Sequence, residues 1–306
     1  MLLGQLGFVA DRRQRGLQVS NKPGFWARNE FLIRRLHSLT GLLPVGAYMI
    51  VHLLVNSSVA VSPETFQRSV FSIHALGALL PLVEWTFIFL PIMFHAFLGL
   101  AFTFGASPNY TEYRYNSNFR YTMQRATGLL AFVFIAWHVF HMHGWIHNDA
   151  WRHLIAGYGG MFHPYNAATS AAHAMQASVL YPVFYTVGVL ACVFHLSNGL
   201  FTMGITWGIW ISPKAQHGAK LVTGVFGLGL ALVGITSIVG LYTLKNFAEI
   251  REKENTAYEL LVETGDIPAD PEKRDLSADE SLDEAPPFEG AAAPKADATE
   301  KPAVSE

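Results

Sequence analysis

The stretch PIMFHAF, residues 91–97, places His95 in the middle of an apolar segment. The surrounding run, residues 79–105, contains one other ionisable side chain, Glu84. A helix needs about 20 mostly apolar residues to cross the hydrocarbon core of a bilayer, and this run exceeds that length. The segment is therefore predicted to be a transmembrane helix with an imidazole inside it.

Four other segments have the same apolar character. The five predicted spans are residues 38–56, 79–105, 127–145, 178–206 and 221–244. The composition agrees, because 51% of the residues are hydrophobic and only 14% are charged, whereas soluble domains carry about 25% charged residues. The sequence therefore predicts an all-α integral membrane protein with five transmembrane helices, four of them forming a bundle.

Three more of these spans each carry one histidine well inside the apolar run. They are His52 in YMIVHLL (48–54), His138 in IAWHVF (135–140) and His195 in ACVFHLS (191–197). An imidazole in hydrocarbon costs free energy unless something satisfies it, so it marks a functional site by default. A single such histidine is equally compatible with a hydrogen bond to a neighbouring helix, but one on each of four helices favours a ligand role.

The depths of these histidines sort them into two pairs. If the N-terminus is cytoplasmic, as the basic residues discussed below predict, the first and third helices run outward and the second and fourth run inward. His52 and His138 then lie about five residues from the outer ends of their helices, and His95 and His195 lie about 14–16 residues from the outer ends of theirs. The two pairs therefore differ in depth by about 12–15 Å. Two imidazoles at matched depth on facing helices are what axial ligation of a haem iron requires. The sequence therefore predicts an outer haem on His52 and His138 and an inner haem on His95 and His195, in a diheme-binding bundle.

The cysteine count limits how such haems are held. Cys192 is the single cysteine of the chain. It excludes an internal disulfide and a Cys-x-x-Cys-His attachment motif. Any haem is therefore expected to be bound without a covalent tether, and the net charge of −2 gives no indication of a nucleic-acid partner.

The distribution of basic residues predicts the orientation of the helices. Lys and Arg are frequent before the first span, between the second and third, and between the fourth and fifth, and rare in the other two connections. The positive-inside rule then predicts a cytoplasmic N-terminus (residues 1–30) and an external C-terminus. Residues 146–177 are expected to form a long external loop with a short interfacial helix. Residues 248–306 form an acidic tail, expected to be largely disordered after one short amphipathic helix.

Four polar residues are weaker candidates. Glu84, the one acid inside an apolar run, is a candidate proton acceptor beside an outer quinone pocket, although it could also extend to the interface. His37, Ser38 and Arg125 are candidate partners of the inner haem's propionates, because they cluster at the cytoplasmic ends of the first and third helices. Ordinary interfacial anchoring is the alternative for the basic side chains.

Five short runs carry a resemblance to a known family. They are FLIRRLHSLTG (31–41), FLPIMFHA (89–96), QRATG (124–128), AWHV (136–139) and FHLSNGL (194–200). Together they resemble the diheme cytochrome b anchor of succinate dehydrogenases and fumarate reductases, and especially its single-subunit, five-helix type that reacts with menaquinone. The resemblance covers about residues 31–244, so that residues 31–247 are expected to form the diheme membrane domain.

The resemblance implies the protein's partners and setting. It implies two b haems, a flavoprotein subunit that carries the dicarboxylate chemistry, and an iron–sulfur subunit on the cytoplasmic face. Electrons would move between that subunit and menaquinone, in a multi-pass protein of the bacterial cytoplasmic membrane. The family's pairing of histidines, first helix with third and second with fourth, agrees with the pairing by depth.

Three other readings remain open at this point. The chain could be a different membrane cytochrome b, from a hydrogenase, a formate dehydrogenase or a quinol:cytochrome c reductase. The last usually carries two ligands on each of two helices, which one histidine per helix argues against. A transporter could use the histidines as a proton relay, but discontinuous helices and further buried acids would be expected there. A structural anchor without haem would not need four intact ligand candidates.

Overall fold

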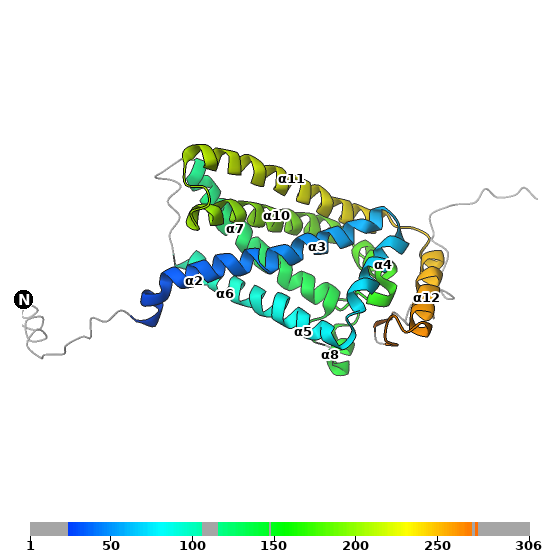
Figure 1. The fold of residues 1–306 in the computed structure, drawn as a ribbon. Coiled ribbons are helices and arrows are strands. Elements are labelled where there is room, and N and C mark those ends of the chain that lie inside the picture. The colour runs from blue at the N-terminus through cyan, green and yellow to red at the C-terminus, as the bar shows by residue number, and fades with distance from the viewer. Residues whose placement is uncertain (1–23, 106–115, 147, 271–272, 275–306) are drawn as a thin grey trace, which may run out of the picture. The chain divides into compact units, whose positions relative to one another are not determined.

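The computed structural model describes residues 24–105, 116–146, 148–270 and 273–274 (Figure 1). Within these residues the chain is helical and contains no strand, which confirms the predicted fold class. The same residues contain five helical segments long and apolar enough to cross a membrane. These are Phe25–Ala60, Gly77–Phe104, Asn118–His143, Leu180–Thr206 and Pro213–Thr243. All five predicted spans are therefore present, and the first, third and last begin earlier than the apolar runs alone suggested.

The first span consists of two helices, α2 (Phe25–Leu42) and α3 (Val45–Ser57). The break lies at Pro44, which has no backbone N–H to donate to the preceding turn. The early start of α2 reflects a polar segment that remains helical beyond the apolar run, with Arg34 paired to Glu30 one turn away at 2.8 Å. Hydropathy could not find this extension, because helical structure outside the bilayer does not require apolar residues.

The second span combines α5 (Leu80–Glu84), a π-helical turn η3 (Trp85–Phe89) and α6 (Leu90–Phe104). The third combines α7 (Asn116–His138) with a second π-helical turn, η4 (Val139–His143). Single π turns inside α-helices are rare and often accompany functional sites. The fourth and fifth spans are the continuous helices α10 (Leu180–Thr206) and α11 (Pro213–Thr243).

The chain divides into two compact units. The first contains the segments up to Asn56, Ala78–Trp137 and Val183–Thr236, and the second contains Ser57–Gly77, His138–Pro182 and the chain from Ser237 onward. In the first unit α2 and α6 lie side by side (Figure 1). Much of α6 is apolar and exposed, including Leu90 at 55% and Phe97 at 64%. An apolar surface of this kind fits contact with lipid rather than water.

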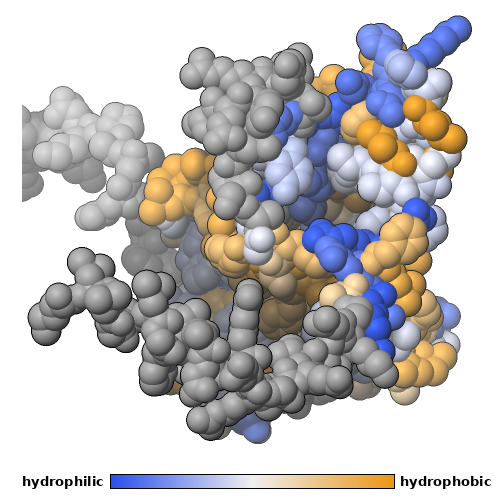
Figure 2. All heavy atoms as spheres, turned by 90° about the vertical axis from the view of Figure 1, so that its left-hand side faces the viewer, coloured by the Kyte–Doolittle hydropathy of each residue, from blue (hydrophilic) through white to orange (hydrophobic). Residues whose placement is uncertain are grey.

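The end of the first unit where α2 begins has a mixed surface. Figure 2 views the molecule from that side and shows hydrophilic and hydrophobic side chains interspersed. Trp26 and Phe31 are 67% and 71% exposed there, and the Arg35 guanidinium lies 4.4 Å from the centre of the Phe31 ring. Aromatic rings beside arginines are typical of the membrane–water interface, where each finds both an apolar and a wet environment.

The second unit is built around the short helices α4 (Pro63–His74), α8 (Asp149–Ile155) and α9 (Ala167–Gln176), the turn η5 (Pro164–Asn166), and α12 (Phe247–Glu263). Two helices thus occupy the third-to-fourth connection, where one short interfacial helix was expected. Nearly all of α9 is buried, because its alanines, Thr169 and Ser170 are small enough to allow close packing. α12 lies where the tail was expected to begin with an amphipathic helix, and residues 275–306 lie outside the described residues.

Side chains from distant helices complete the N-terminus of α9. The residue before α9, Asn166, makes no capping hydrogen bond with its own side chain. Instead the Gln67 side-chain oxygen accepts from the Ala167 N–H at 2.6 Å, and Glu254 accepts from the N–H groups of Ala168 and Thr169 at 2.8 and 3.2 Å. A carboxylate at this position satisfies free backbone donors and complements the helix dipole. Glu254 on α12 therefore ties the C-terminal helix to α9.

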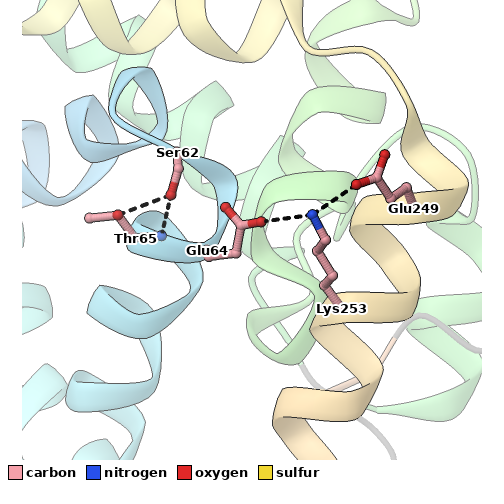
Figure 3. Close-up of polar contacts among 5 residues, drawn as sticks. All are labelled: Ser62, Glu64, Thr65, Glu249 and Lys253. Atoms are coloured by element: carbon pink, nitrogen blue, oxygen red, sulfur yellow. Dashed lines mark hydrogen bonds and ion pairs between the residues drawn. The ribbon is translucent and has the colours of Figure 1, made fainter.

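Two further contacts join α12 to the same unit. At the surface, Lys253 bridges Glu64 of α4 at 3.2 Å and Glu249 of its own helix at 2.8 Å (Figure 3). In the interior, Tyr258 packs with Tyr165 and Phe71 in an apolar cluster. The buried contacts dominate, since exposed ion pairs contribute about 0–1 kcal/mol.

Replacing Glu254 with alanine should loosen α12. The side chain is 3% exposed and bonds two amides and the Thr169 hydroxyl, so its loss leaves buried donors without an acceptor and should cost about 2–3 kcal/mol. Hydrogen exchange of amides in α9 and α12 measures the effect. The exposed neighbour Glu252 provides the matched control, Glu252→Ala, and equal exchange in the two variants would contradict the capping role.

The second unit should also lose stability in acid through His74. This imidazole contacts the Tyr165 ring edge-on, and its Nδ1 atom is buried without a hydrogen bond. Burial, helped by Lys273 and opposed by Asp270, lowers the pKa of His74 from 6.5 to about 4. A depressed histidine pKa means that the unfolded chain binds the proton more tightly, so stability present above pH 6.5 is lost as the pH falls toward 4.

The expected loss between pH 6.5 and 4 is about 2–3 kcal/mol for the wild type. A His74→Phe variant should lose correspondingly less over the same range, as measured by the pH dependence of hydrogen exchange in α4. His173, which is exposed in the same unit, supplies the control His173→Phe. Identical pH profiles for wild type and His74→Phe would show that His74 is not the titrating group.

Candidate functional site

The structure brings together the two histidines predicted to hold the inner haem. His95 lies on α6 and His195 on α10, and their ring centroids are 6.0 Å apart with the ring planes at 82°. With metal–nitrogen bonds of about 2 Å and a ring radius of about 1 Å, two imidazoles on opposite sides of one metal ion have centroids about 6 Å apart. The spacing of His95 and His195 therefore fits one iron held between them.

Backbone carbonyl groups orient both rings. The His95 Nδ1 atom lies 2.8 Å from the carbonyl oxygen of His37, and the His195 Nδ1 atom lies 3.0 Å from that of Gln124. A carbonyl oxygen only accepts hydrogen bonds, so each Nδ1 carries the proton and each Nε2 presents a lone pair. A second-shell hydrogen bond of this kind is the usual way in which a protein fixes the tautomer of a metal-binding histidine.

Two glycines make room for these rings. A Cβ atom built on Gly41 of α2 would overlap the His95 ring, and one built on Gly128 of α7 would lie 2.8 Å from His195 Cε1. No side chain larger than hydrogen fits at either position without displacing an imidazole. In the structure the absence of a side chain at Gly41 and Gly128 leaves space for the His95 and His195 rings.

A Gly41→Ala substitution should therefore disturb the inner site. The new methyl group must push the His95 ring away, and displacements of this kind in the groups around a metal ligand reduce metal affinity by about 10–100-fold. The haem content of the purified protein measures the loss. Gly224→Ala is the matched control, because nothing lies within 4 Å of a Cβ at that position of α11. Full haem content in Gly41→Ala would contradict the packing described for His95.

The three candidate propionate partners lie near the inner pair but are differently engaged. The His37 ring stacks on the His95 ring with centroids 4.1 Å apart and planes at 5°. Ser38 accepts a hydrogen bond from the Trp207 indole at 3.4 Å, and Arg125 donates to the carbonyl oxygen of Thr103. Their role toward propionates stays a prediction, with His37 placed closest to a ligand ring.

The two residues predicted to hold the outer haem lie on different helices. His52 lies on α3, stacked with the Tyr48 ring at 5.5 Å and 29°. His138 is the last residue of α7, immediately before the π-helical turn η4. His52 belongs to the first compact unit and His138 to the second, and their pairing on one iron stays a prediction from the sequence.

Glu84 lies where the second span changes its helical geometry. It ends α5 and precedes the π-helical turn η3, and its carboxylate is close enough to the Tyr48 phenol to interact with it electrostatically. Tyr48 in turn stacks on His52. An acid, a phenol and a candidate ligand of the outer haem are thus neighbours in the first unit.

The sequence patterns did not single out Tyr48, nor Gln124 and Asn198 beside His195. Each is a polar residue one helical turn from a histidine, or from the glycine that faces one: Tyr48 precedes His52 by four positions, Gln124 precedes Gly128 by four, and Asn198 follows His195 by three. Residues spaced in this way share a helix face. This spacing is the signal that could have identified them.

Comparison with known proteins identifies the family. No family model matches the chain. The succinate dehydrogenase cytochrome b558 subunit of Bacillus subtilis (strain 168) is 35% identical over 213 residues, which cover 68% of this chain and 96% of that subunit. The match extends over nearly the whole relative. The chain belongs to the family of succinate dehydrogenase cytochrome b subunits.

Proposed function

We propose that this chain is the membrane anchor of a succinate:quinone oxidoreductase and carries electrons between an iron–sulfur subunit and menaquinone through two b haems. The observation that supports this most strongly is the geometry of His95 and His195, with one free Nε2 on each ring and centroids 6.0 Å apart. Membership of a cytochrome b family implies haem b. The second haem is assigned to His52 and His138 on the sequence argument.

The residues of the inner site would act by holding and insulating the redox group. His95 and His195 would hold the haem iron, and the carbonyl groups of His37 and Gln124 keep both rings in one tautomer. The bound haem supplies one-electron chemistry, with a potential set by its ligands, their hydrogen bonds and its exclusion from water. The surrounding apolar helices keep water away from it.

Glu84 and Tyr48 are proposed to exchange protons with the quinone on the outer side. Quinone reduction takes up protons as well as electrons, and both side chains can donate or accept one. Their proximity to His52 would place proton exchange next to the outer haem, so that both could reach the same quinone. In fumarate reduction the same residues would accept protons from menaquinol.

The proposed setting is the bacterial cytoplasmic membrane, with the N-terminus inside and the C-terminus outside, as the basic residues predict. The flavoprotein and iron–sulfur subunits would then dock at the end of the helices where α2 begins. That end mixes exposed aromatic and basic side chains such as Trp26 and Arg34, a composition that suits a protein interface as well as a membrane surface.

The test is purification of the complex through a tag on this chain, followed by addition of succinate. We expect a flavoprotein and an iron–sulfur protein to co-purify, succinate to reduce the haem, and a menaquinone analogue to reoxidise it. Reduction by formate or hydrogen but not by succinate would instead assign the chain to another quinone-linked enzyme. A purified chain without haem would contradict the proposal in all its forms.

A further inference from the structure

Three polar side chains join α7 to α10 beside the inner ligand His195. The Arg120 Nε group donates to the Asn198 side-chain oxygen at 2.8 Å, and the Asn198 amide donates to the Gln124 side-chain oxygen at 2.7 Å. The Gln124 amide then donates to the carbonyl oxygen of His195 at 3.1 Å. The chain Arg120–Asn198–Gln124 therefore ends on the ligand residue.

This polar chain lies inside an otherwise apolar pair of helices. Asn198 is 2% exposed, and α10 around it is formed by apolar residues such as Val193, Leu196 and Phe201. Burying an amide costs free energy unless all its polar atoms are satisfied. A well-packed pair of apolar residues would hold the helices together about as well. The polar chain therefore requires an explanation other than stability.

Gln124 holds His195 at two points. Its backbone oxygen accepts from the His195 Nδ1 group, and its side-chain amide donates to the His195 backbone oxygen. The first bond orients the imidazole ring, and the second fixes the backbone from which the ring extends. Asn198 keeps the Gln124 side chain in place, and Arg120 keeps Asn198 in place.

Arg120 also brings a permanent positive charge close to this site. Its guanidinium lies 4.4 Å from the centre of the Phe201 ring, and the Lys220 ammonium lies 5.7 Å from the same ring. A cation in a medium of low dielectric constant favours the less positive state of a nearby redox group. For a haem iron that state is the reduced one, so the charge of Arg120 raises the reduction potential.

We propose that Arg120, Asn198 and Gln124 are positioning residues of the inner haem: Gln124 and Asn198 fix the His195 ligand, and Arg120 raises the potential. This inference rests on the proposed function, because it requires His195 to be an axial ligand. It assigns a redox role to residues outside the ligand set. The expected consequence is that the inner haem has a higher reduction potential than its two imidazole ligands alone would give it. It would therefore accept electrons from the iron–sulfur subunit more readily.

The test uses Asn198→Leu and Arg120→Gln in the complete complex, with Thr202→Val as control, since Thr202 bonds only its own helix. Redox titration measures the midpoint of the inner haem, and low-temperature electron paramagnetic resonance reports the orientation of its ligands. Asn198→Leu should change both the paramagnetic resonance signal of the inner haem and its midpoint potential. Arg120→Gln keeps a donor for Asn198 but removes the charge. It should therefore lower the equilibrium constant for haem reduction about tenfold, which lowers the midpoint potential by about 59 mV for one electron, and leave the paramagnetic resonance signal unchanged.

The outcomes separate this inference from the proposed function. If His195→Leu leaves the haem spectrum unchanged, the proposed function fails. If His195→Leu removes the inner haem while Asn198→Leu and Arg120→Gln retain the wild-type midpoint and resonance, the inference alone is overturned. A midpoint change confined to Asn198→Leu supports the positioning role and refutes the charge effect. If Asn198→Leu does not assemble, Arg120→Gln still decides whether the charge acts.

Discussion

Replacing His95 or His195 with leucine should remove the inner haem and leave the outer one in place. In the proposed site both rings would be needed to hold the inner haem iron, and the remaining imidazole alone would not keep the iron in the same low-spin environment. The haem content of either variant should fall from about two to about one per chain, the ratio that the two-pair assignment requires. Succinate should no longer reduce the remaining haem at the wild-type rate, since the inner one stands first in the path.

The matched control for these variants is His217→Leu. His217 lies on α11, in a membrane-spanning segment, but is exposed and belongs to neither pair. It should leave the spectrum unchanged. If His95→Leu keeps both spectral components, or His217→Leu loses one, the ligand assignment is wrong.

Glu84→Gln should lower quinone reduction by about 100-fold, the lower end of the range for loss of a general acid or base. The amide has nearly the same shape as the carboxyl group but cannot exchange a proton. Reduction of the haems by succinate should proceed normally, because it precedes the quinone step. Stopped-flow spectroscopy of haem reduction, combined with steady-state turnover of a menaquinone analogue, separates the two steps.

Two further variants sharpen this test. Tyr48→Phe removes the phenol that neighbours Glu84 and stacks on His52, and should also slow turnover with little effect on haem reduction. Glu30→Gln alters an exposed acid paired with Arg34 and should have no effect. Full turnover in Glu84→Gln would exclude Glu84 from the proton path, and a loss of haem reduction as well would show a structural defect instead.

Much of the fold could be predicted because membrane spans leave a strong signal. An apolar run of sufficient length must form a helix in a bilayer, where no water satisfies the backbone. Alternating helix directions then placed His95 and His195 at one depth, and the structure brings their rings to 6.0 Å. The positions of the spans and the depth of each histidine both follow from constraints that act along a single helix.

The features that could not be predicted depend on contacts between distant segments. Glu254 caps α9 from a helix about 85 residues away, and no local pattern around Glu254 distinguishes it from the exposed acids of α12. The orienting carbonyl groups of His37 and Gln124 belong to the backbone, which every residue shares. The Arg120–Asn198–Gln124 chain likewise exists only once α7 and α10 are packed together.

We propose that this chain holds two b haems, each between a pair of histidines. The most direct measurement is a redox titration of the purified complex, followed by its reduced-minus-oxidised spectrum and by haem quantitation per chain. The account predicts about two haems per chain and two components with separate midpoints, of which His95→Leu removes the one with the higher potential. One haem per chain, or a spectrum unchanged by His95→Leu and His195→Leu, would contradict it.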